Sequence, residues 1–239
     1  MPGLRVVPSA KSTNDLVKDP SLPDFSAVIT DNQESGRGRL DRKWSSSPGN
    51  GLAYSFVTPP IPVGFITSLP IVVGVALVRA LRNAGAQSCG LKWPNDVLAP
   101  PGKLAGILCE ICPENRVVVG LGLNIRSSSP SPDANAVALD QLIRINEEVV
   151  DRILTETSEL VRGFCLQPSE ARLSELLAGA SRVMLTLGQT VEVVEHNRSP
   201  WRAQALAISP EGHLVVRELE TGKQRKIASA DIVHLRQTG

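Results

Sequence analysis

Three apolar segments separated by short turns constrain the fold of this chain more than any other feature. They run over 91–98, 103–110 and 116–125, and a Pro-Pro-Gly turn joins the first two. Parallel neighbours need a crossover of a dozen or more residues, whereas antiparallel neighbours need only a tight turn. The spacing therefore predicts an antiparallel or mixed sheet rather than a series of βαβ units.

The rest of the first part of the chain alternates between strand-like and helix-like patterns. Residue type and apolar period predict strands over 26–31 and 51–57, and helices over 14–18, 66–83, 147–164 and 172–177. The predicted fold class is therefore α+β, a mixed, largely antiparallel sheet flanked by helices.

From Leu187 onward the pattern changes to short alternating runs separated by turns. The runs cover 190–194, 203–208, 214–219, 224–228 and 232–235. Five short strands so closely spaced predict a small β-barrel. We therefore expect a first domain over 1–184 and a second over 185–239.

Composition excludes several classes of partner. The formal net charge is only +1, so nothing in the whole chain attracts nucleic acid or an anionic membrane. The longest apolar run, Phe65 to Val78, is shorter than the roughly 20 residues that span a bilayer. The first residues contain no apolar signal region. We expect a cytoplasmic protein without nucleic-acid or membrane partners.

Cysteine usage favours free thiols over a metal site. Cys109 and Cys112 form a CxxC within a strand-like run, where positions three apart face opposite sides. No second CxxC follows, and the three histidines lie far downstream. We expect buried free thiols and no zinc.

The stretch from Gln33 to Trp44 combines two glycines with four cations. It lacks Val and Ile, and its glycines oppose a helix, so a flexible loop is expected. In an extended chain Arg37 and Arg39 would point the same way, about 6.6 Å apart, a spacing that suits neighbouring phosphates. Trp44 offers a face for a purine. A nucleotide site is one interpretation; a solvated basic turn or an RNA-contacting segment is the other.

Five polar motifs occur in order along residues 1–125. They are Ser-Thr-Asn at 12–14, Gly-Arg-Gly-Arg-Leu-Asp-Arg-Lys-Trp at 36–44, Lys-Trp-Pro-Asn-Asp at 92–96, Lys-Leu-Ala-Gly-Ile-Leu-Cys-Glu at 103–110 and Gly-Leu-Gly-Leu-Asn at 120–124. In this order and spacing they closely resemble the biotin protein ligases, over almost the whole chain. The resemblance implies a biotin/lipoate ligase-like catalytic domain followed by an SH3-like β-barrel.

The resemblance also implies a two-step reaction. Biotin and MgATP give biotinyl-5′-adenylate and pyrophosphate, and a lysine of a biotin carboxyl carrier protein domain then takes the biotinyl group. Biotin, ATP, Mg²⁺ and the carrier domain are thus the expected ligands and partners, and a homodimer is allowed. Only eleven residues precede Ser12-Thr13-Asn14, so the chain resembles the stand-alone type without a DNA-binding domain.

The same resemblance implies roles for individual residues. The catalytic set is Lys103, Arg37, Arg39 and Asp96, with Lys103 as the cation that serves both biotin carboxylate and α-phosphate. The biotin set is Ser12, Thr13, Asn14, Gln33, Gly36, Arg37, Lys103, Gly106 and Gly120. The nucleotide set is Arg37, Arg39, Trp44, Asn95, Lys103 and Asn124, with Arg42 a weaker candidate. Asp96 is expected to hold Mg²⁺ or to accept a hydrogen bond from the incoming lysine, and Glu110 is a weaker carboxylate candidate.

Some alternatives remain open at the level of sequence. For Ser12 the alternative to a biotin contact is a helix N-cap alone. Asp41 replaces a glycine of the family pattern and adds a negative charge near the expected phosphates. A protein that only binds biotin or its adenylate is a second hypothesis, although it would need neither Lys103 nor the arginines. A lipoate-type ligase is a third, although the characteristic Arg-Arg-x-Ser-Gly-Gly-Gly segment is missing.

Overall fold

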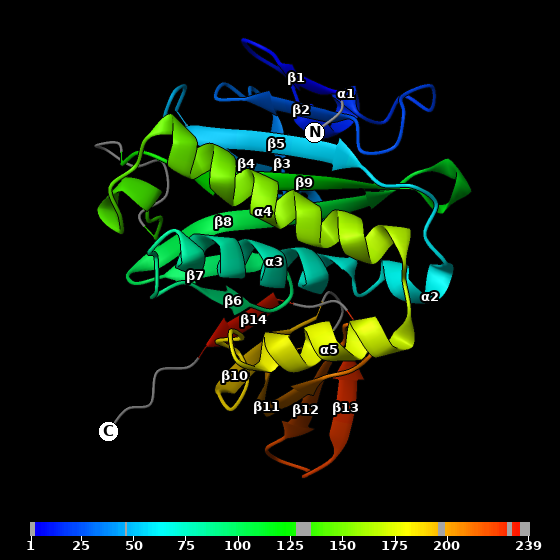
Figure 1. Ribbon diagram of the computed structural model, residues 1–239. Helices are drawn as coiled ribbons and strands as arrows, with labels where there is room; N and C mark the ends of the chain where they lie inside the picture. Colours follow the sequence, from blue (N-terminus) through cyan, green and yellow to red (C-terminus); the bar gives the residue numbers. More distant parts are fainter. Residues whose placement is uncertain (1–2, 46, 128–134, 196–198, 229–230, 235–239) are drawn as a thin grey trace.

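The protein folds into two main sheets joined by helices, with a further two-stranded ladder (Figure 1). The structure is a computed structural model that describes residues 3–234 except 46, 128–134, 196–198 and 229–230. A seven-stranded sheet is formed by the first part of the chain, and a five-stranded sheet by its C-terminal part. The predicted α+β class is confirmed.

The large sheet has the strand order β1-β2-β5-β9-β8-β7-β6. Its strands are β1 (Leu4–Val6), β2 (Ala27–Thr30), β5 (Gly51–Val57), β6 (Gly90–Lys92), β7 (Asp96–Ala99), β8 (Gly102–Ile111) and β9 (Val117–Asn124). Only β1 and β2 pair in parallel, and the other neighbours are antiparallel. The sheet is therefore mixed and largely antiparallel, as the short turns predict.

The segment 91–98 is a hairpin and not one strand. β6 and β7 pair antiparallel across a tight turn, with Lys92 opposite Asp96. Pro94 lies in this turn, and proline cannot donate a ladder hydrogen bond. The proline therefore ends β6 and reverses the chain, so that one more strand is added to the sheet edge.

Helices cover one face of the large sheet (Figure 1). They are α3 (Leu69–Asn83) and α4 (Glu147–Leu166). The short helix α2 (Val63–Ile66) precedes α3, α5 (Glu170–Ser181) lies over the C-terminal strands, and α1 (Thr13–Leu16) contacts β5 and β9. The helix expected over 66–83 begins at Leu69, because Pro70 suits the first turn of α3, where its missing N–H costs nothing. α3 packs against α4 and α5 and is almost entirely buried.

The C-terminal sheet is antiparallel, with the order β13-β12-β11-β10-β14. Its strands are β10 (Thr190–Val194), β11 (Trp201–Ile208), β12 (Leu214–Glu218), β13 (Gln224–Ile227) and β14 (Asp231–His234). The connecting segment joins the large sheet, since Leu91 N–H donates to Val183 O and Leu185 N–H donates to Leu91 O, both at 2.8 Å. The proposed domain boundary at 184/185 lies within this connection.

None of the helices within the described ranges is both long enough and apolar enough to cross a bilayer.

Candidate functional site

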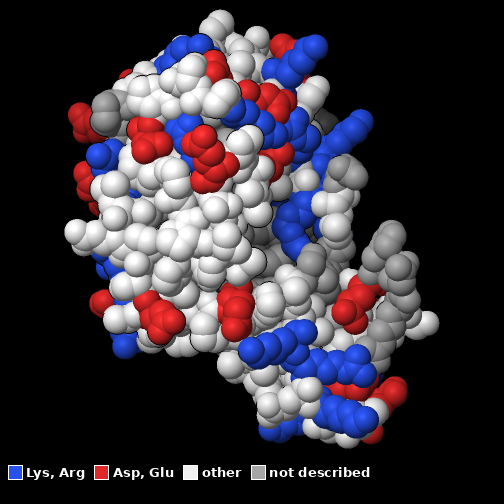
Figure 2. Space-filling model, turned by 90° about the vertical axis from the view of Figure 1, so that its right-hand side faces the viewer, with Lys and Arg blue, Asp and Glu red and all other residues white. Residues whose placement is uncertain are grey.

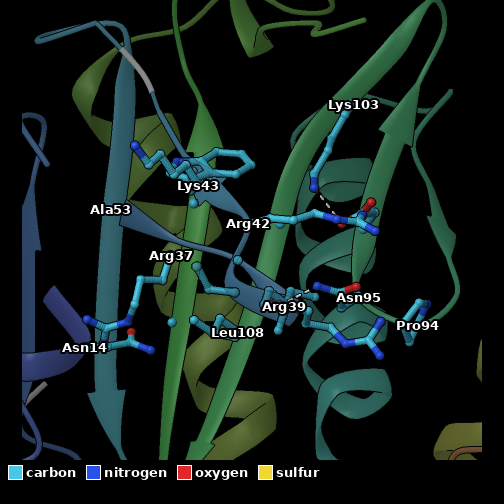
Figure 3. A pocket seen from close by; sticks show the side chains of 18 of the residues that line it. Asn14, Arg37, Arg39, Arg42, Lys43, Ala53, Pro94, Asn95, Lys103 and Leu108 are labelled. Atoms are coloured by element: carbon cyan, nitrogen blue, oxygen red, sulfur yellow. Dashed lines mark hydrogen bonds and ion pairs between the residues drawn. The ribbon is translucent and has the colours of Figure 1, made fainter. Parts of the chain in front are cut away.

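A cavity of about 710 Å³ opens on the face of the large sheet opposite the helices (Figure 3). Strand alternation accounts for this position. The Tyr54 hydroxyl lies 3.0 Å from the Ser158 hydroxyl of α4, so its neighbours Ala53 and Ser55 point to the other face and line the cavity. Figure 2 shows lysine and arginine side chains within a hollow above the C-terminal sheet. The cations that line the cavity are Arg37, Arg39, Arg42, Lys43, Lys92 and Lys103.

The cavity brings together most of the residues that the sequence singled out. They are Ser12, Thr13, Asn14, Gln33, Arg37, Arg39, Trp44, Asn95, Asp96, Lys103, Gly106 and Gly120. Gly36 and Asn124 lie outside this lining. At Gly36, a Cβ would collide with the Trp44 carbonyl and the Gln33 amide, so the glycine permits close approach of chain segments. The Asn124 amide nitrogen donates to Lys103 O at 3.1 Å and to Val137 O at 3.2 Å.

Uncharged polar groups form a buried network at one end of the cavity. The Thr13 N–H donates to Gln33 Oε1 at 2.9 Å, and the Thr13 hydroxyl lies 2.7 Å from the Ser55 hydroxyl. Ser55 Oγ donates in turn to Asn14 Oδ1 at 2.6 Å. Ser12 occupies the N-cap position of α1, but its side chain makes no capping hydrogen bond. These groups present fixed donors and acceptors without a formal charge.

Asn14 connects this network to a carboxylate. Its amide nitrogen donates to Glu110 Oε2 at 2.6 Å, and Lys18 Nζ donates to Glu110 Oε1 at 2.8 Å. Burial raises the pKa of Glu110, but hydrogen bonds from Lys18 and Asn14 outweigh it and leave that pKa below its ordinary value. A Cβ at Gly120 would collide with the Asn14 side chain, so the glycine is needed to seat Asn14. Glu110 therefore supports the wall of the cavity.

Arg37 points away from Arg39 (Figure 3). Its guanidinium donates to both oxygens of Asp15, at 2.8 and 2.6 Å, and lies 3.4 Å from Glu110 Oε2. The hydrogen bond from Arg37 lowers the pKa of Asp15 to about 2. The expectation that Arg37 and Arg39 project in the same direction is therefore wrong.

The segment around these arginines is also more regular than expected. Gly36–Arg37 (β3) and Lys43–Trp44 (β4) pair as a two-stranded ladder, and the 3₁₀ turn η1 (Arg39–Asp41) connects them. The Gly38 N–H donates to Arg42 O at 2.7 Å. We call residues 36–44 the Gly-Arg hairpin. Its turn breaks the extended geometry and directs Arg39 toward Asp96, and burial lowers the pKa of Arg39. The side chain of Asp41 lies outside the described part of the chain.

The Trp44 indole packs over Gly106 and Gly122 on the strands behind the cavity. A Cβ at Gly122 would collide with the indole, and one at Gly106 would lie 3.1 Å from its Cζ3. Lys103 Nζ is 5.4 Å from the ring centroid, a distance at which a cation is attracted to an aromatic face. The expected stacking of Trp44 on a purine stays a prediction.

A carboxylate surrounded by cations occupies the other end of the cavity. Asp96 Oδ1 lies 2.7 Å from Lys103 Nζ, and Arg39 and Lys92 interact with Asp96 electrostatically. Burial lowers the pKa of Lys92. Such a cluster has more positive than negative charge, so it favours a polyanion such as a triphosphate. The nearby Asn95 amide nitrogen donates to Ile107 O at 2.7 Å, which fixes the turn before Asp96.

Sequence reasoning assigned no role to several residues that line the cavity, namely Lys92, Trp93, Ser55, Gly122 and Ile232. Three of them had a visible signal. Lys92 and Trp93 open the Lys-Trp-Pro-Asn-Asp motif, and Ser55 is a hydroxyl within an otherwise apolar strand. Ile232 comes from β14, and no local pattern could have placed it beside residues of the large sheet.

The cysteines are free thiols. Cys89 and Cys165 are buried, whereas Cys109 and Cys112 are only partly buried. Burial raises the pKa of Cys165 to about 12, and it raises the pKa of Cys109 as well. Among the described residues, no group of three or more His, Cys, Asp and Glu side chains is arranged to hold a metal ion.

Comparison with known proteins relates this site to one family. Residues 5–124 match the biotin/lipoate A/B protein ligase family. The chain is 32% identical to the biotin–[acetyl-CoA-carboxylase] ligase of Mycobacterium tuberculosis, covering 98% of this chain and 89% of that protein. It is also 32% identical to the bifunctional ligase/repressor BirA of Bacillus spizizenii, over 62% of this chain and 47% of the relative. The chain thus spans about half the length of such bifunctional relatives.

The fold agrees with these relationships. The biotin protein ligase from Aquifex aeolicus in complex with biotin and ATP superposes with a TM-score of 0.79 and 26% identity. The match covers 99% of this chain and 100% of that chain, so it includes the C-terminal sheet.

Proposed function

Because the chain belongs to the biotin/lipoate A/B protein ligase family, we propose that it activates biotin with ATP and transfers it to a carrier protein. The products of the first step are biotinyl-5′-adenylate and pyrophosphate, and the acceptor is a lysine of a biotin carboxyl carrier protein domain. One observation carries the proposal. A single cavity joins an uncharged polar network at one end to a cluster of partly buried cations at the other.

The polar end suits the head of biotin. The ureido group has two N–H donors and one carbonyl acceptor and carries no charge, so it needs fixed uncharged partners. Ser12, Thr13, Asn14 and Gln33 supply hydroxyl and amide groups in this region. A Thr13–Ser55–Asn14 relay orients them before a ligand enters.

The cationic end suits the triphosphate. Adenylation brings a carboxylate against a phosphate, and local positive charge offsets the negative charge of that transition state. Lys103 lies between the two ends, beside Asp96 and the Trp44 ring, so it is the group we assign to the reacting atoms. Arg39 and Lys92 hold the phosphates, while Arg37, already paired with Asp15, anchors the Gly-Arg hairpin. Trp44 stacks on the adenine, and Asn95 and Asn124 use their side-chain oxygens toward the nucleoside.

Asp96 fits the role of a magnesium partner. Mg²⁺ is commonly held by one or two carboxylates together with substrate phosphates rather than by a cage of protein ligands. A single carboxylate near the expected phosphates fits this mode of Mg²⁺ binding. Asp96 would have to give up its ion pair with Lys103 to bind the metal. The metal would neutralise phosphate charge. In the transfer step Asp96 alternatively accepts a hydrogen bond from the incoming lysine.

We also propose a cytoplasmic location, which the use of ATP and the free cysteines support. We further propose that the protein forms a homodimer, which analytical ultracentrifugation would test by measuring its mass in solution.

Mass spectrometry of a carrier domain incubated with the protein, biotin and MgATP tests the function. We expect a gain of one biotinyl group on one lysine, and pyrophosphate release that depends on biotin. Pyrophosphate release with lipoate or octanoate but not with biotin would indicate the lipoate-type alternative. Biotin binding without any pyrophosphate release would indicate a protein that only binds biotin.

A further inference from the structure

Trp93 links the cavity to the C-terminal sheet. Its side chain is only 1% exposed, and its indole N–H donates to Gly212 O at 2.9 Å across 119 residues of sequence. Gly212 lies in the turn between β11 and β12, so a residue of the Lys-Trp-Pro-Asn-Asp motif is bonded to a hairpin of the other sheet. A buried hydrogen bond of this kind is costly to break, because the abandoned acceptor has no water to replace the donor.

The backbone of Trp93 is also hydrogen-bonded to the segment that leads into the C-terminal sheet. Its N–H donates to the Thr186 hydroxyl at 3.0 Å, and Thr186 is fully buried in the connection to the C-terminal sheet. Two directional bonds, one from the main chain and one from the ring, therefore fix both the position and the orientation of this residue. Neither bond involves a group that we assign to biotin or ATP.

Gly212 in turn cannot shift freely. Its φ of +79° lies in the left-handed region, and a Cβ at this position would come within 2.9 Å of Ser68 Cα and 3.0 Å of Thr67 O. The β11–β12 turn is thus seated against the start of α3, and its carbonyl offers a fixed acceptor to the indole. Only glycine satisfies both conditions.

The residues that follow Trp93 belong to the cationic end of the cavity. Pro94, Asn95 and Asp96 line it directly, and Ile232 of β14 lines it from the C-terminal sheet. We propose that Trp93 is a positioning residue, which uses its bond to Gly212 to set the turn 93–95 and so couples the C-terminal sheet to the nucleotide end of the cavity. The inference rests on the proposed function only for the identity of the ligands.

Coupling between two sites is reciprocal. If the C-terminal sheet orders the turn for ATP, then ATP must stabilise the contact between the turn and that sheet. Biotin with MgATP should therefore slow amide hydrogen exchange in residues 209–214. ATP affinity, measured by calorimetry with biotin present, should fall roughly fivefold to a hundredfold when the bond is removed. Biotin affinity should change less than threefold, because the polar network lies at the other end.

The first variant is Trp93→Phe, which keeps an aromatic ring but loses the N–H. Its matched control is Trp201→Phe, which removes an indole N–H that donates to Glu195 Oε2 at 3.0 Å within the C-terminal sheet. Trp93→Phe should lose both ATP affinity and the ligand-induced protection of 209–214, while Trp201→Phe keeps both. Circular dichroism melting of each variant shows whether the fold is retained.

A second variant, Gly212→Ala, disturbs the acceptor of the Trp93–Gly212 hydrogen bond, in the C-terminal sheet and outside the cavity lining. Even without ligand, Gly212→Ala should speed hydrogen exchange in residues 92–98. The double variant Trp93→Phe/Gly212→Ala should lose no more ATP affinity than the more affected single variant, because both changes remove the same bond. Unchanged exchange at 92–98 in Gly212→Ala would overturn the inference whether or not the protein binds biotin. Equal ATP affinity in Trp93→Phe and Trp201→Phe would do the same. Failure of the wild type to release pyrophosphate would count against the proposed function alone.

Discussion

The Gly-Arg hairpin and the turn 93–95 both line one cavity, and they are held in place by different forces. The hairpin depends on charged contacts near the surface, in which the side chains of Arg37 and Asp15 are 39% and 48% exposed. The turn depends on hydrogen bonds made by a tryptophan that is almost completely buried. Exposed ion pairs typically contribute about 0–1 kcal/mol, whereas stranding a buried polar group costs about 1–3 kcal/mol.

This difference indicates that the hairpin is the movable wall of the cavity and the turn a fixed one. The hairpin has little apolar surface to offset the cost of ordering, roughly 1 kcal/mol or more for each residue. It should therefore open without ligand and close when phosphates attract its cations. The turn keeps Asp96 in place throughout. A closed hairpin would also exclude water from an adenylate that otherwise hydrolyses.

Replacing the lysine between the two walls should have the largest effect. Lys103→Ala should slow adenylate formation at least a hundredfold, because a cation that offsets transition-state charge is typically worth about 3 kcal/mol or more. Biotin affinity should fall much less. Pyrophosphate release under saturating ligands, together with calorimetry of biotin binding, separates the two quantities.

The control is Lys226→Ala, which removes a lysine paired with Glu211 on the C-terminal sheet. It should behave as the wild type does. Adenylation by Lys103→Ala within threefold of wild type would show that another cation, with Lys92 the first candidate, performs this role.

Limited proteolysis compares the two walls directly. Arg42 and Lys43 are exposed in the hairpin, whereas Lys92 precedes the buried Trp93. Trypsin should cut within 37–43 at least tenfold faster in the free protein than with biotin and MgATP, because binding lowers the population of the open state. It should not cut after Lys92 in either state. Adenine alone should protect little, since it gives the arginines no anionic partner.

Equal cleavage rates with and without ligands would mean that the hairpin is ordered beforehand or is not part of the site. Cleavage after Lys92 in the free protein would contradict the fixed wall.

Most of the fold follows from local patterns in the sequence. The short turns between apolar segments predict the largely antiparallel sheet, and the alternating runs after Leu187 predict the C-terminal sheet. Treating 91–98 as one segment misses the hairpin, although Pro94-Asn95-Asp96 interrupts its apolar residues. Pro94 was the signal that could have divided it.

The gathering of the site residues also follows from the motifs, but their individual contacts do not. Arg37 and Arg39 are two positions apart, yet Arg37 is hydrogen-bonded to Asp15 while Arg39 is attracted electrostatically to Asp96, because a 3₁₀ turn intervenes. The bond from Trp93 to Gly212 joins residues 119 positions apart. Such contacts depend on how two sheets meet, and no periodicity within either sheet contains that information.

A smaller effect concerns the ion pair that anchors the hairpin. The hydrogen bond from Arg37 lowers the pKa of Asp15 from 3.8 to about 2. Because the pKa of Asp15 is lower in the folded state, its ion pair with Arg37 contributes fully to folding stability above pH 3.8. This contribution is lost as the pH falls toward about 2. Carbon-detected NMR titration of the Asp15 carboxyl should therefore find its midpoint near 2, and Arg37→Ala should return it toward 3.8.

Asp19 provides the internal control. Hydrogen bonds from Ser21 lower the pKa of Asp19, so that pKa should not respond to Arg37→Ala. An unchanged Asp15 midpoint in Arg37→Ala would show that the hairpin is not anchored by this pair and would remove the basis for separating the roles of Arg37 and Arg39.

The smallest expected effect lies at the tip of the hairpin, where Asp41 ends the η1 turn. Asp41→Gly removes a negative charge near the expected phosphates and restores the residue typical of the family, so ATP should bind more tightly. Salt screens the charge interaction, so we expect a small gain, on the order of threefold or less. Glycine also enlarges the open-state ensemble, which acts in the opposite direction. Calorimetry of ATP binding at low and at physiological salt separates the charge effect from the effect of backbone entropy. Salt weakens the charge effect by screening and leaves the entropy effect unchanged. Weaker ATP binding at both salt concentrations would mean that Asp41 stabilises the closed hairpin.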